Sequence, residues 1–317
     1  MRIEPIAAGD AKFEKLASEL GSAFVQSWWL NALGEEVERL GVIAQDGQLI
    51  GGFVLHSTTL KGVSCLANPP FTPHIGLFAK QKSSNPARIV SATKELLKTL
   101  IEYLEGRSEK IIDIRLPFTY KDLQEFYWSD FDVSPRYTYR LDLDRSEEEI
   151  LASMDPKTRN AIKAAESNGI EIIEASASEI ETNISAILKE RKAKVRLDLL
   201  SKLFSSVEAQ NRIGLLARSE HEDEALAYCI IHGGESYYLF GGNKSSGTVG
   251  SSGSLIMWSA IKAAKSKGVK TFDFEGSMIP GVEKFFRGFG GELTTYFAIQ
   301  KIPMAYRVAA KIAGKKF

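Results

Sequence analysis

Two carboxylates near the end of the chain could do acid–base chemistry. In the stretch FDFE at 272–275, the side chains of a strand would alternate, so that both acids share one face and both aromatic rings the other. A carboxylate there could accept a proton from an amine, which must lose its charge before it attacks an ester or thioester carbonyl. Glu275 and Asp273 are therefore our candidates for a catalytic proton acceptor.

Cations follow these acids on a short predicted helix, within GVEKFFRGFGG at 281–291. Arg287 and Lys284 could meet a phosphate or a developing oxyanion. We assign Arg287 to catalysis and Lys284 to substrate binding. A surface ion pair between Glu283 and Arg287, four residues apart, explains the same pattern without a ligand.

A second basic cluster opens a predicted helix in MDPKTRN at 154–160. The helix dipole and the side chains of Arg159 and Lys157 could act together on a phosphate, and Arg159 is the preferred anion contact. Solvation of an exposed helix face explains the cluster equally well.

Four further residues are candidates for substrate contact: Tyr238, Trp258, His74 and Arg115. Trp258 suits the apolar face of a helix and is as easily a core residue. His74 lies in the stiff loop NPPFTPHIG at 68–76, where three prolines restrict the backbone. A histidine without an evident acidic or thiol partner is more often structural.

The elements that would position these side chains occur twice along the chain. Each copy has three strands, a helix that ends at a glycine and a further strand. In the first copy the three strands lie within 41–60 and 61–78, the helix at 87–105 and the further strand at 110–118. In the second copy the three strands lie within 212–242, the helix at 254–268 and the further strand at 269–277. This order predicts a duplicated domain, although two unrelated meanders followed by helices would leave the same trace. Asp113 takes the place of Asp273 in the first copy, which favours a structural role for that acid, and Arg115 takes the place of Glu275.

The segment between the copies predicts how the second domain begins. A strand precedes Ser146, which is an N-cap for a helix with an acidic first turn; Pro156 starts a second helix, which ends at Asn168. We place the first domain at 1–135 and the second at 136–300. The basic segment 301–317 is expected to form a helix that packs back on the first domain.

Composition indicates a soluble protein of about two globular domains, with 44% hydrophobic and 25% charged residues in 317. Lys+Arg and Asp+Glu each number 40, so no overall charge favours DNA as a partner. Cys65 and Cys229 lack metal-ligand spacing, which predicts buried thiols in a reducing compartment. No signal peptide or bilayer-spanning run can be read, so we expect a cytoplasmic protein.

The track from Tyr237 to Phe297 resembles the acyltransferase fold called GNAT, in the version used by FemABX-like peptidoglycan aminoacyltransferases. Its matching pieces are YYLFGG at 237–242, KSKGV at 265–269 and FDFEGS at 272–277, and MDPKTRNAIKAAESNG at 154–169 also looks like a track of that family. The resemblance covers nearly the whole chain. It implies an α/β fold of two tandem GNAT-like domains, each a mixed, mainly antiparallel sheet flanked by helices.

Two positions depart from the patterns of these enzymes. In the family motif F-K-x-x-F-G, Phe285, Phe289 and Gly290 fit, but Phe286 stands where the family has a lysine, which weakens the case for aminoacyl-tRNA as donor. Enzymes of this fold that use acetyl-CoA show a Q/R-x-x-G-x-G/A loop that holds pyrophosphate. The corresponding loop at 243–258 has Gly250 and Gly253 but no Arg or Gln at the expected position.

The resemblance implies an acyl- or aminoacyltransferase that moves an activated acyl group onto an amine, such as that of a peptidoglycan precursor. The acyl donor, aminoacyl-tRNA or acyl-CoA, would be a co-substrate, with no tightly bound cofactor and no metal. Backbone donors near Gly241 and Gly242 would polarise the carbonyl, and the acceptor would bind between the domains. That acceptor would be a small molecule or be linked to a lipid or nucleotide, and the basic tail could touch the inner face of the membrane.

Two other functions stay open. The first is an N-acyltransferase that uses CoA or a carrier-protein thioester and acts on a small amine or a cell-envelope sugar. The second is a non-catalytic binding module, a duplicated acyltransferase fold without a donor site. The missing lysine and the missing pyrophosphate loop permit both.

Overall fold

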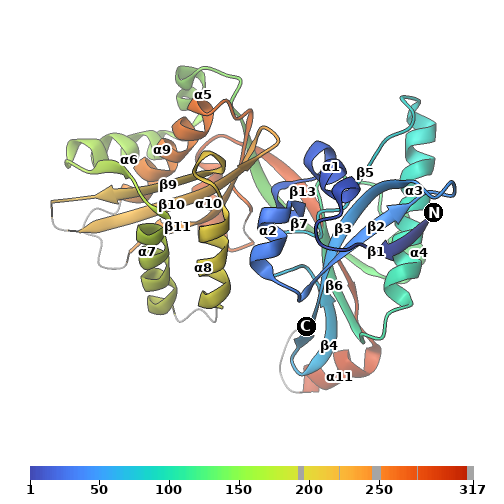
Figure 1. The fold of residues 1–317 in the computed structure, drawn as a ribbon. Helices are drawn as coiled ribbons and strands as arrows, with labels where there is room; N and C mark the ends of the chain where they lie inside the picture. Colours follow the sequence, from blue (N-terminus) through green and yellow to red (C-terminus); the bar gives the residue numbers. More distant parts are fainter. Residues whose placement is uncertain (192–195, 221, 245–250, 277, 313–317) are drawn as a thin grey trace. The chain divides into compact units, whose positions relative to one another are not determined.

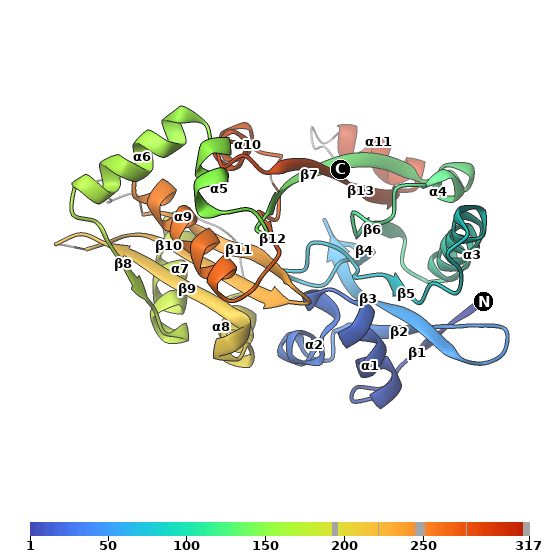
Figure 2. The same ribbon diagram turned by 90° about the horizontal axis from the view of Figure 1, so that it is seen from above.

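The computed structural model describes residues 1–191, 196–220, 222–244, 251–276 and 278–312, and its chain forms two compact units (Figures 1 and 2). Unit 1 joins Met1–Arg136 to the segment from Thr295 onward, and unit 2 is Tyr137–Thr294. The chain therefore leaves the first unit, builds the second and returns to the first.

Unit 1 contains a sheet of order β1-β2-β3-β4-β6-β13, in which β4 and β6 are parallel and the other neighbours antiparallel. Its elements are β1 (Arg2–Pro5), α1 (Ala11–Leu20), α2 (Ser27–Leu33), β2 (Val37–Ile43), β3 (Leu49–Leu60), β4 (Val63–Ala67), β5 (Phe78–Ala79), α3 (Pro86–Glu105), β6 (Ile111–Leu116), α4 (Gln124–Trp128), β13 (Glu292–Lys301) and α11 (Met304–Ile312).

The alternation of side chains along β3 gives the sheet of unit 1 a helix on each face. Phe53 belongs to a buried cluster with Leu97 and Leu100 of α3. The neighbouring Gly52 points the other way, where a Cβ atom would lie 2.4 Å from the ring of Phe13 in α1. Helices α1 and α3 thus cover opposite faces, and the glycine lets α1 approach closely.

Unit 2 contains a sheet of order β7-β12-β11-β10-β9-β8, in which β11 and β12 are parallel and the other neighbours antiparallel. Its elements are β7 (Asp132–Asp142), α5 (Glu147–Ser153), α6 (Pro156–Ser167), β8 (Glu171–Glu174), α7 (Ala177–Glu190), α8 (Leu197–Ser206), β9 (Arg212–Arg218), β10 (Asp223–His232), β11 (Glu235–Asn243), α9 (Ser252–Ser266), β12 (Thr271–Asp273) and α10 (Pro280–Arg287).

Unit 2 is layered in the same way as unit 1. Cys229 of β10 is buried in a cluster that contains Trp258 and Ile261 of α9. The preceding residue, Tyr228, faces the opposite side and meets the ring of Phe204 in α8 edge-on, with 4.6 Å between ring centroids. The sheet therefore lies between α9 and α8.

The predicted helix starts in unit 2 are present. The hydroxyl of Ser146 accepts the N–H of Glu149, and the carboxylate of Glu149 accepts the N–H of Ser146, which forms a capping box at α5. Pro156 occupies the first turn of α6, after the cap Asp155. Satisfying the first N–H groups of a helix in this way fixes where it begins.

The two units repeat one strand order. In each, three antiparallel strands are followed by a long helix and then by a strand parallel to the third: β2-β3-β4, α3 and β6 in unit 1, and β9-β10-β11, α9 and β12 in unit 2. Each parallel strand also has an antiparallel neighbour from a distant segment, β13 beside β6 and β7 beside β12. The predicted fold class, a mixed and mainly antiparallel sheet flanked by helices, is confirmed.

Cys65 and Cys229 are buried and free of disulfides. None of the helices in the described ranges combines the length and the apolarity that a bilayer crossing needs. Within the same ranges, no three His, Cys, Asp or Glu side chains come together as metal ligands.

Candidate active site

A gap between two parallel strands sets one end of the sheet in unit 2 apart. Strands β11 and β12 are paired only from Glu235–Thr271 to Tyr237–Asp273, because β12 ends there while β11 continues to Asn243. The register of β11 against β10 also shifts at Leu239, a β-bulge that changes the direction of the backbone groups. In the described part of the chain, no strand covers this side of β11 beyond Tyr237.

The equivalent gap in unit 1 is closed by the chain itself. Beyond the last β4–β6 pair, Ile75 donates its N–H to the carbonyl of Arg115 in β6 and accepts the N–H of Val54 in β3, both at 2.9 Å. Asn68 accepts the N–H of Arg115 at 2.9 Å and donates to the carbonyl of Pro73 at 2.8 Å, which holds the proline-rich loop in place. Among the described residues of unit 2, no strand or loop takes the equivalent place beside β11.

A row of polar side chains crosses the sheet of unit 2 at the start of this gap. Arg140 of β7 and Tyr237 of β11 are the register partners of Asp273 in β12. Asp273 is buried and accepts three hydrogen bonds, from the hydroxyl of Thr138 at 2.6 Å, from Nη1 of Arg140 at 2.9 Å and from the N–H of Glu275 at 2.9 Å. Three donors around one carboxyl favour its ionised form.

The strand predicted for 272–275 is shorter in the structure, which corrects one part of the sequence analysis. It ends at Asp273, and Glu275 takes a left-handed backbone conformation with φ of 58°, followed by Gly276 with φ of 71°. A Cβ atom on Gly276 would lie 2.4 Å from the carbonyl oxygen of Tyr137, so only glycine fits there. Glu275 is thus turned out of the strand at the point where the gap opens, and its unusual conformation marks it for attention.

The two acids do not share one electrostatic environment. Burial raises the pKa of Glu275 well above its usual range, and the charge of Asp273 raises it further. Burial also raises the pKa of Asp273, but Arg140 and Thr138 oppose that rise. Because all three contacts of Asp273 are donors, they favour its ionised form, so Glu275 is the more readily protonated acid of the two.

Two consecutive glycines, Gly241 and Gly242, let two side-chain donors approach the backbone of β11 beyond its last pair with β12. A Cβ atom on Gly241 would lie 1.9 Å from the hydroxyl oxygen of Tyr238, and one on Gly242 would lie 3.0 Å from Nη2 of Arg191. The Tyr238 hydroxyl and the Arg191 guanidinium therefore rest on strand backbone. Tyr238 was expected to bind substrate, and it lies beside the gap, with its ring 5.9 Å from that of Phe286.

The cations predicted on α10 lie apart from the paired acids. Arg287 forms an ion pair with Glu283 at 3.1 Å, and its side chain is 60% exposed. Glu283 also accepts the hydroxyl of Tyr139 at 2.7 Å, so this pair ties α10 to β7. Lys284 is exposed. The surface ion pair described as the alternative is present, and a catalytic role for Arg287 stays a prediction.

In the second basic cluster, Arg159 and Lys157 at the start of α6, the arginine contacts the end of α5. Nη1 of Arg159 donates to the carbonyl of Met154 at 2.5 Å and to that of Ala152 at 3.3 Å, where the last carbonyls of α5 lack helical partners. Lys157 is exposed at the start of α6. The structure therefore gives Arg159 a capping role, and binding of an anion by either residue remains a prediction.

The remaining candidates lie in core or loop positions. Trp258 is only 3% exposed within the core of unit 2, and Nζ of Lys262 lies 5.6 Å from its ring centroid. His74 and Arg115 belong to unit 1, where Nδ1 of His74 accepts the N–H of Gly76 at 3.0 Å. The loop at 243–258 includes residues 245–250, so its Gly250 lies outside the described residues.

Sequence reasoning missed two polar residues of this region, namely Arg140 and Glu235. Arg140 donates through Nη1 to Asp273 and through Nη2 to Glu235, and Glu235 accepts the hydroxyl of Tyr237 at 2.5 Å. The only sequence signal for Arg140 was its place on the polar side of the alternating strand at 137–142. The sequence does not show that this strand pairs with β12, because the two strands are more than a hundred residues apart.

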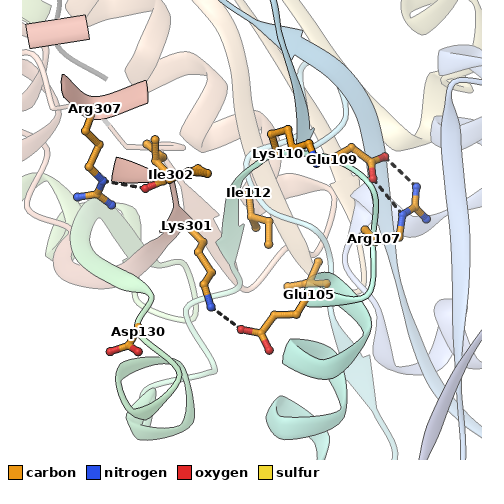
Figure 3. A pocket seen from close by; sticks show the side chains of 11 residues that line it. Glu105, Arg107, Glu109, Lys110, Ile112, Asp130, Lys301, Ile302 and Arg307 are labelled. Carbon is orange, nitrogen blue, oxygen red and sulfur yellow. Dashed lines mark hydrogen bonds and ion pairs between the residues drawn. The ribbon is translucent and has the colours of Figure 1, made fainter. Parts of the chain in front are cut away.

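A cavity of 470 Å³ in unit 1, near the beginning of β6, offers a second concave surface (Figure 3). Three of the cations that line it already have partners: Lys301 donates to Glu105, Arg107 pairs with Glu109 at 3.0 Å and Arg307 donates to a carbonyl at 3.0 Å. The gap in unit 2, with its free strand backbone and turned-out acid, is the stronger candidate for chemistry.

The pair of Arg107 and Glu109 gives a prediction about acid stability. Burial opposes ionisation of Glu109, but hydrogen bonds from Arg107 and Ser57 lower its pKa to about 2. A lowered folded-state pKa adds stability above the unfolded-state value of about 4.3, and that stability disappears as the pH falls toward about 2. Arg107→Met should cost about 1 kcal/mol at pH 7 and almost nothing at pH 2, measured by urea unfolding. A difference that does not change with pH would contradict this.

Comparisons with known proteins point to one fold. The FemAB family model matches residues 124–215. The crystal structure of FemX matches with a TM-score of 0.67 at 15% identity, over 98% of this chain and 99% of that one. The chain has a FemABX-like tandem GNAT fold.

Two further solved structures share the fold. A tandem GNAT protein from the clavulanic acid biosynthesis pathway has a TM-score of 0.59 at 11% identity, over 94% of this chain and 97% of that one. L-PGS from Bacillus licheniformis has a TM-score of 0.59 at 12% identity, over 96% of each chain. Comparison with curated protein sequences gives no match.

Proposed function

We propose that the protein transfers an activated acyl group to an amine, with the gap between β11 and β12 as donor site and Glu275 as proton acceptor. One observation carries this proposal: a carboxyl with a raised pKa is held in a left-handed turn where two parallel strands separate and β11 continues, within the described part of the chain, without a partner strand on that side. Backbone N–H groups that face away from paired strands can polarise a carbonyl, and the nearby acid can take the proton of the attacking amine.

The chemistry follows from this placement. The amine nitrogen attacks the acyl carbon of an ester or thioester, and the negative charge that develops on the carbonyl oxygen is stabilised by N–H groups of β11 within 238–242. The nitrogen loses its proton to the ionised carboxylate of Glu275. The bond from the acyl carbon to the leaving oxygen or sulfur then breaks, which forms an amide.

The raised pKa of Glu275 suits a base for amines. A carboxylate with a pKa nearer to neutrality is a stronger base than an ordinary glutamate, although a larger fraction of it is protonated at a given pH. The rate should therefore rise with pH as Glu275 ionises. The midpoint of this rise should lie above the usual pKa range of a glutamate.

Donor and acceptor belong to the proposal as well. We propose a peptidoglycan precursor or another cell-envelope amine as acceptor, because the match with FemX extends over nearly the whole of both chains. The candidate donors are aminoacyl-tRNA and, second, a CoA or carrier thioester. The thioester is favoured by Phe286, which stands in place of the family lysine and is buried at 6% exposure, so that this position offers no cation to a tRNA.

The donor can be identified by a ligand-stabilisation screen. CoA thioesters, aminoacyl-tRNA and UDP-linked muropeptides would each be added to the protein and the midpoint of thermal unfolding measured, since a ligand that binds only the folded state raises it. We expect one donor class to stabilise the protein. If no donor binds, the non-catalytic binding module would be the better account.

Gly241→Ala should weaken binding of that donor about tenfold. The new methyl group would lie 1.9 Å from the Tyr238 hydroxyl oxygen and 2.7 Å from the carbonyl oxygen of Leu226, so the tyrosine ring must move over the free part of β11. Gly281→Ala, where nothing lies within 4 Å of the added atom, is the matched control. Isothermal titration calorimetry would measure both; equal affinities would argue against a donor site at β11.

A further inference from the structure

The duplicated fold supplies an internal comparison for the site. In unit 2 the row across the sheet is Arg140, Asp273 and Tyr237. The equivalent row in unit 1 is Gln300 of β13, Asp113 of β6 and Ala67 of β4. The aspartate is common to both copies, whereas the residue on its antiparallel neighbour is arginine in one and glutamine in the other.

The two aspartates have different surroundings. Asp113 accepts a hydrogen bond from Nε2 of Gln300 at 3.1 Å, and Arg115 lies 3.9 Å away. Asp273 instead forms a close ion pair with Arg140, whose side chain is 12% exposed. In unit 1 a neutral amide thus takes the position that Arg140 has in unit 2, and the cation at ion-pair distance, Arg115, comes from the strand of the aspartate itself, so the fold does not require an arginine at this position.

We propose that Arg140 is a positioning residue that holds Glu275 at the strand gap by fixing Asp273 as the acceptor of the Glu275 N–H. This inference rests on the proposed function, because it assigns Arg140 its role through the acid that we take as the base. It explains why the arginine and the turned-out glutamate occur in the same copy.

The contacts support action through Asp273. One carboxylate oxygen, Oδ2, accepts Nη1 of Arg140, and the other, Oδ1, accepts the N–H of Glu275. Arg140 is held in turn by Glu235, so its planar guanidinium has little freedom to turn. A left-handed conformation is unfavourable at a residue other than glycine, and the Asp273 contact offsets part of that cost.

Electrostatics points the same way. The titratable and charged groups that face Glu275 are Asp273 on β12, Arg140 on β7, and Glu235 and Tyr237 on β11. Arg140 is the cation among them. Arg140 opposes the effect of burial on the pKa of Asp273; without it, only Thr138 and the Glu275 N–H would favour the ionised form of Asp273.

Arg140→Gln copies the arrangement of unit 1 and is the decisive variant. We expect it to fold, to speed hydrogen exchange of the Glu275 amide at least about tenfold and to raise the titration midpoint of Asp273 by about 1–3 pH units, as loss of an arginine partner does. Both are measured by NMR, without substrate. Arg140→Lys keeps a cation and should restore the midpoint in part. Gln300→Ala, in unit 1, should change neither signal.

Unchanged exchange and an unchanged midpoint in Arg140→Gln would overturn the inference, and so would equal effects of the glutamine and lysine variants. If the glutamine variant fails to fold while the lysine variant folds with an unchanged midpoint, the arginine has only a structural role and the inference is wrong. These readouts do not depend on acyl transfer. A protein that binds no donor but shows the expected shifts would contradict the proposed function and leave the role of Arg140 intact.

Discussion

Glu275→Gln is expected to lower the rate of acyl transfer about 10²- to 10⁴-fold, the range in which a positioned acid or base contributes. The carboxamide keeps the size of the side chain but cannot take the proton of the attacking amine. The loss should fall on kcat/KM, measured from pH 6 to 9 with the donor that stabilises the protein. In the parent protein the rate should rise with pH as Glu275 ionises, and this limb should vanish in the variant.

Glu275→Gln should not lower stability, because the Glu275 contact with Asp273 is made by the backbone N–H and the carboxamide avoids the cost of ionising this acid. Glu292→Gln is the matched control, since Glu292 is an exposed acid at the start of β13. A rate for Glu275→Gln within about threefold of the parent would remove Glu275 from the chemistry.

Asp273→Ala should cost about 3–5 kcal/mol of unfolding free energy, as removal of one partner from a buried ion pair does. Arg140 would keep Glu235 but lose its closest buried acceptor, and Thr138 and the Glu275 N–H would lose theirs as well. Chemical unfolding followed by circular dichroism measures this cost.

The duplicate supplies the control for that prediction. Asp113→Ala removes an acceptor that is bound by a neutral amide and should cost about 1 kcal/mol. Equal costs for the two variants would show that the ion pair with Arg140 adds nothing to the aspartate that both copies share.

Most of the fold could be predicted because its signals are local. The Asp46-Gly47 turn joins β2 to β3, Ser146 and Pro156 start α5 and α6 as expected, and the duplicated order of strands and helix is visible in the chain. What could not be predicted is the order of strands in each sheet, since β13 joins β6 across a long sequence separation. Hydrophobic alternation does not specify a distant partner.

The site was predictable only in part for the same reason. The alternating pattern correctly predicted that Phe272 and Phe274 are buried and that Asp273 lies on the other face of the strand. It failed at Glu275, because the strand ends two residues earlier and the backbone turns into the left-handed region. Arg159 shows another limit: its role as an anion contact stays a prediction, but the sequence did not indicate that the break at Pro156 puts the carbonyls at the end of α5 within its reach.

The most direct test of the account is a crystal structure with a stable donor analogue, either a thioether analogue of acyl-CoA or an amide-linked aminoacyl oligonucleotide. The account predicts the analogue in unit 2, with its carbonyl oxygen within hydrogen-bond distance of a backbone N–H of β11 between Tyr238 and Gly242 and its acyl carbon facing Glu275. An analogue bound in the cavity of unit 1, with protein side chains filling the gap beside β11, would contradict it.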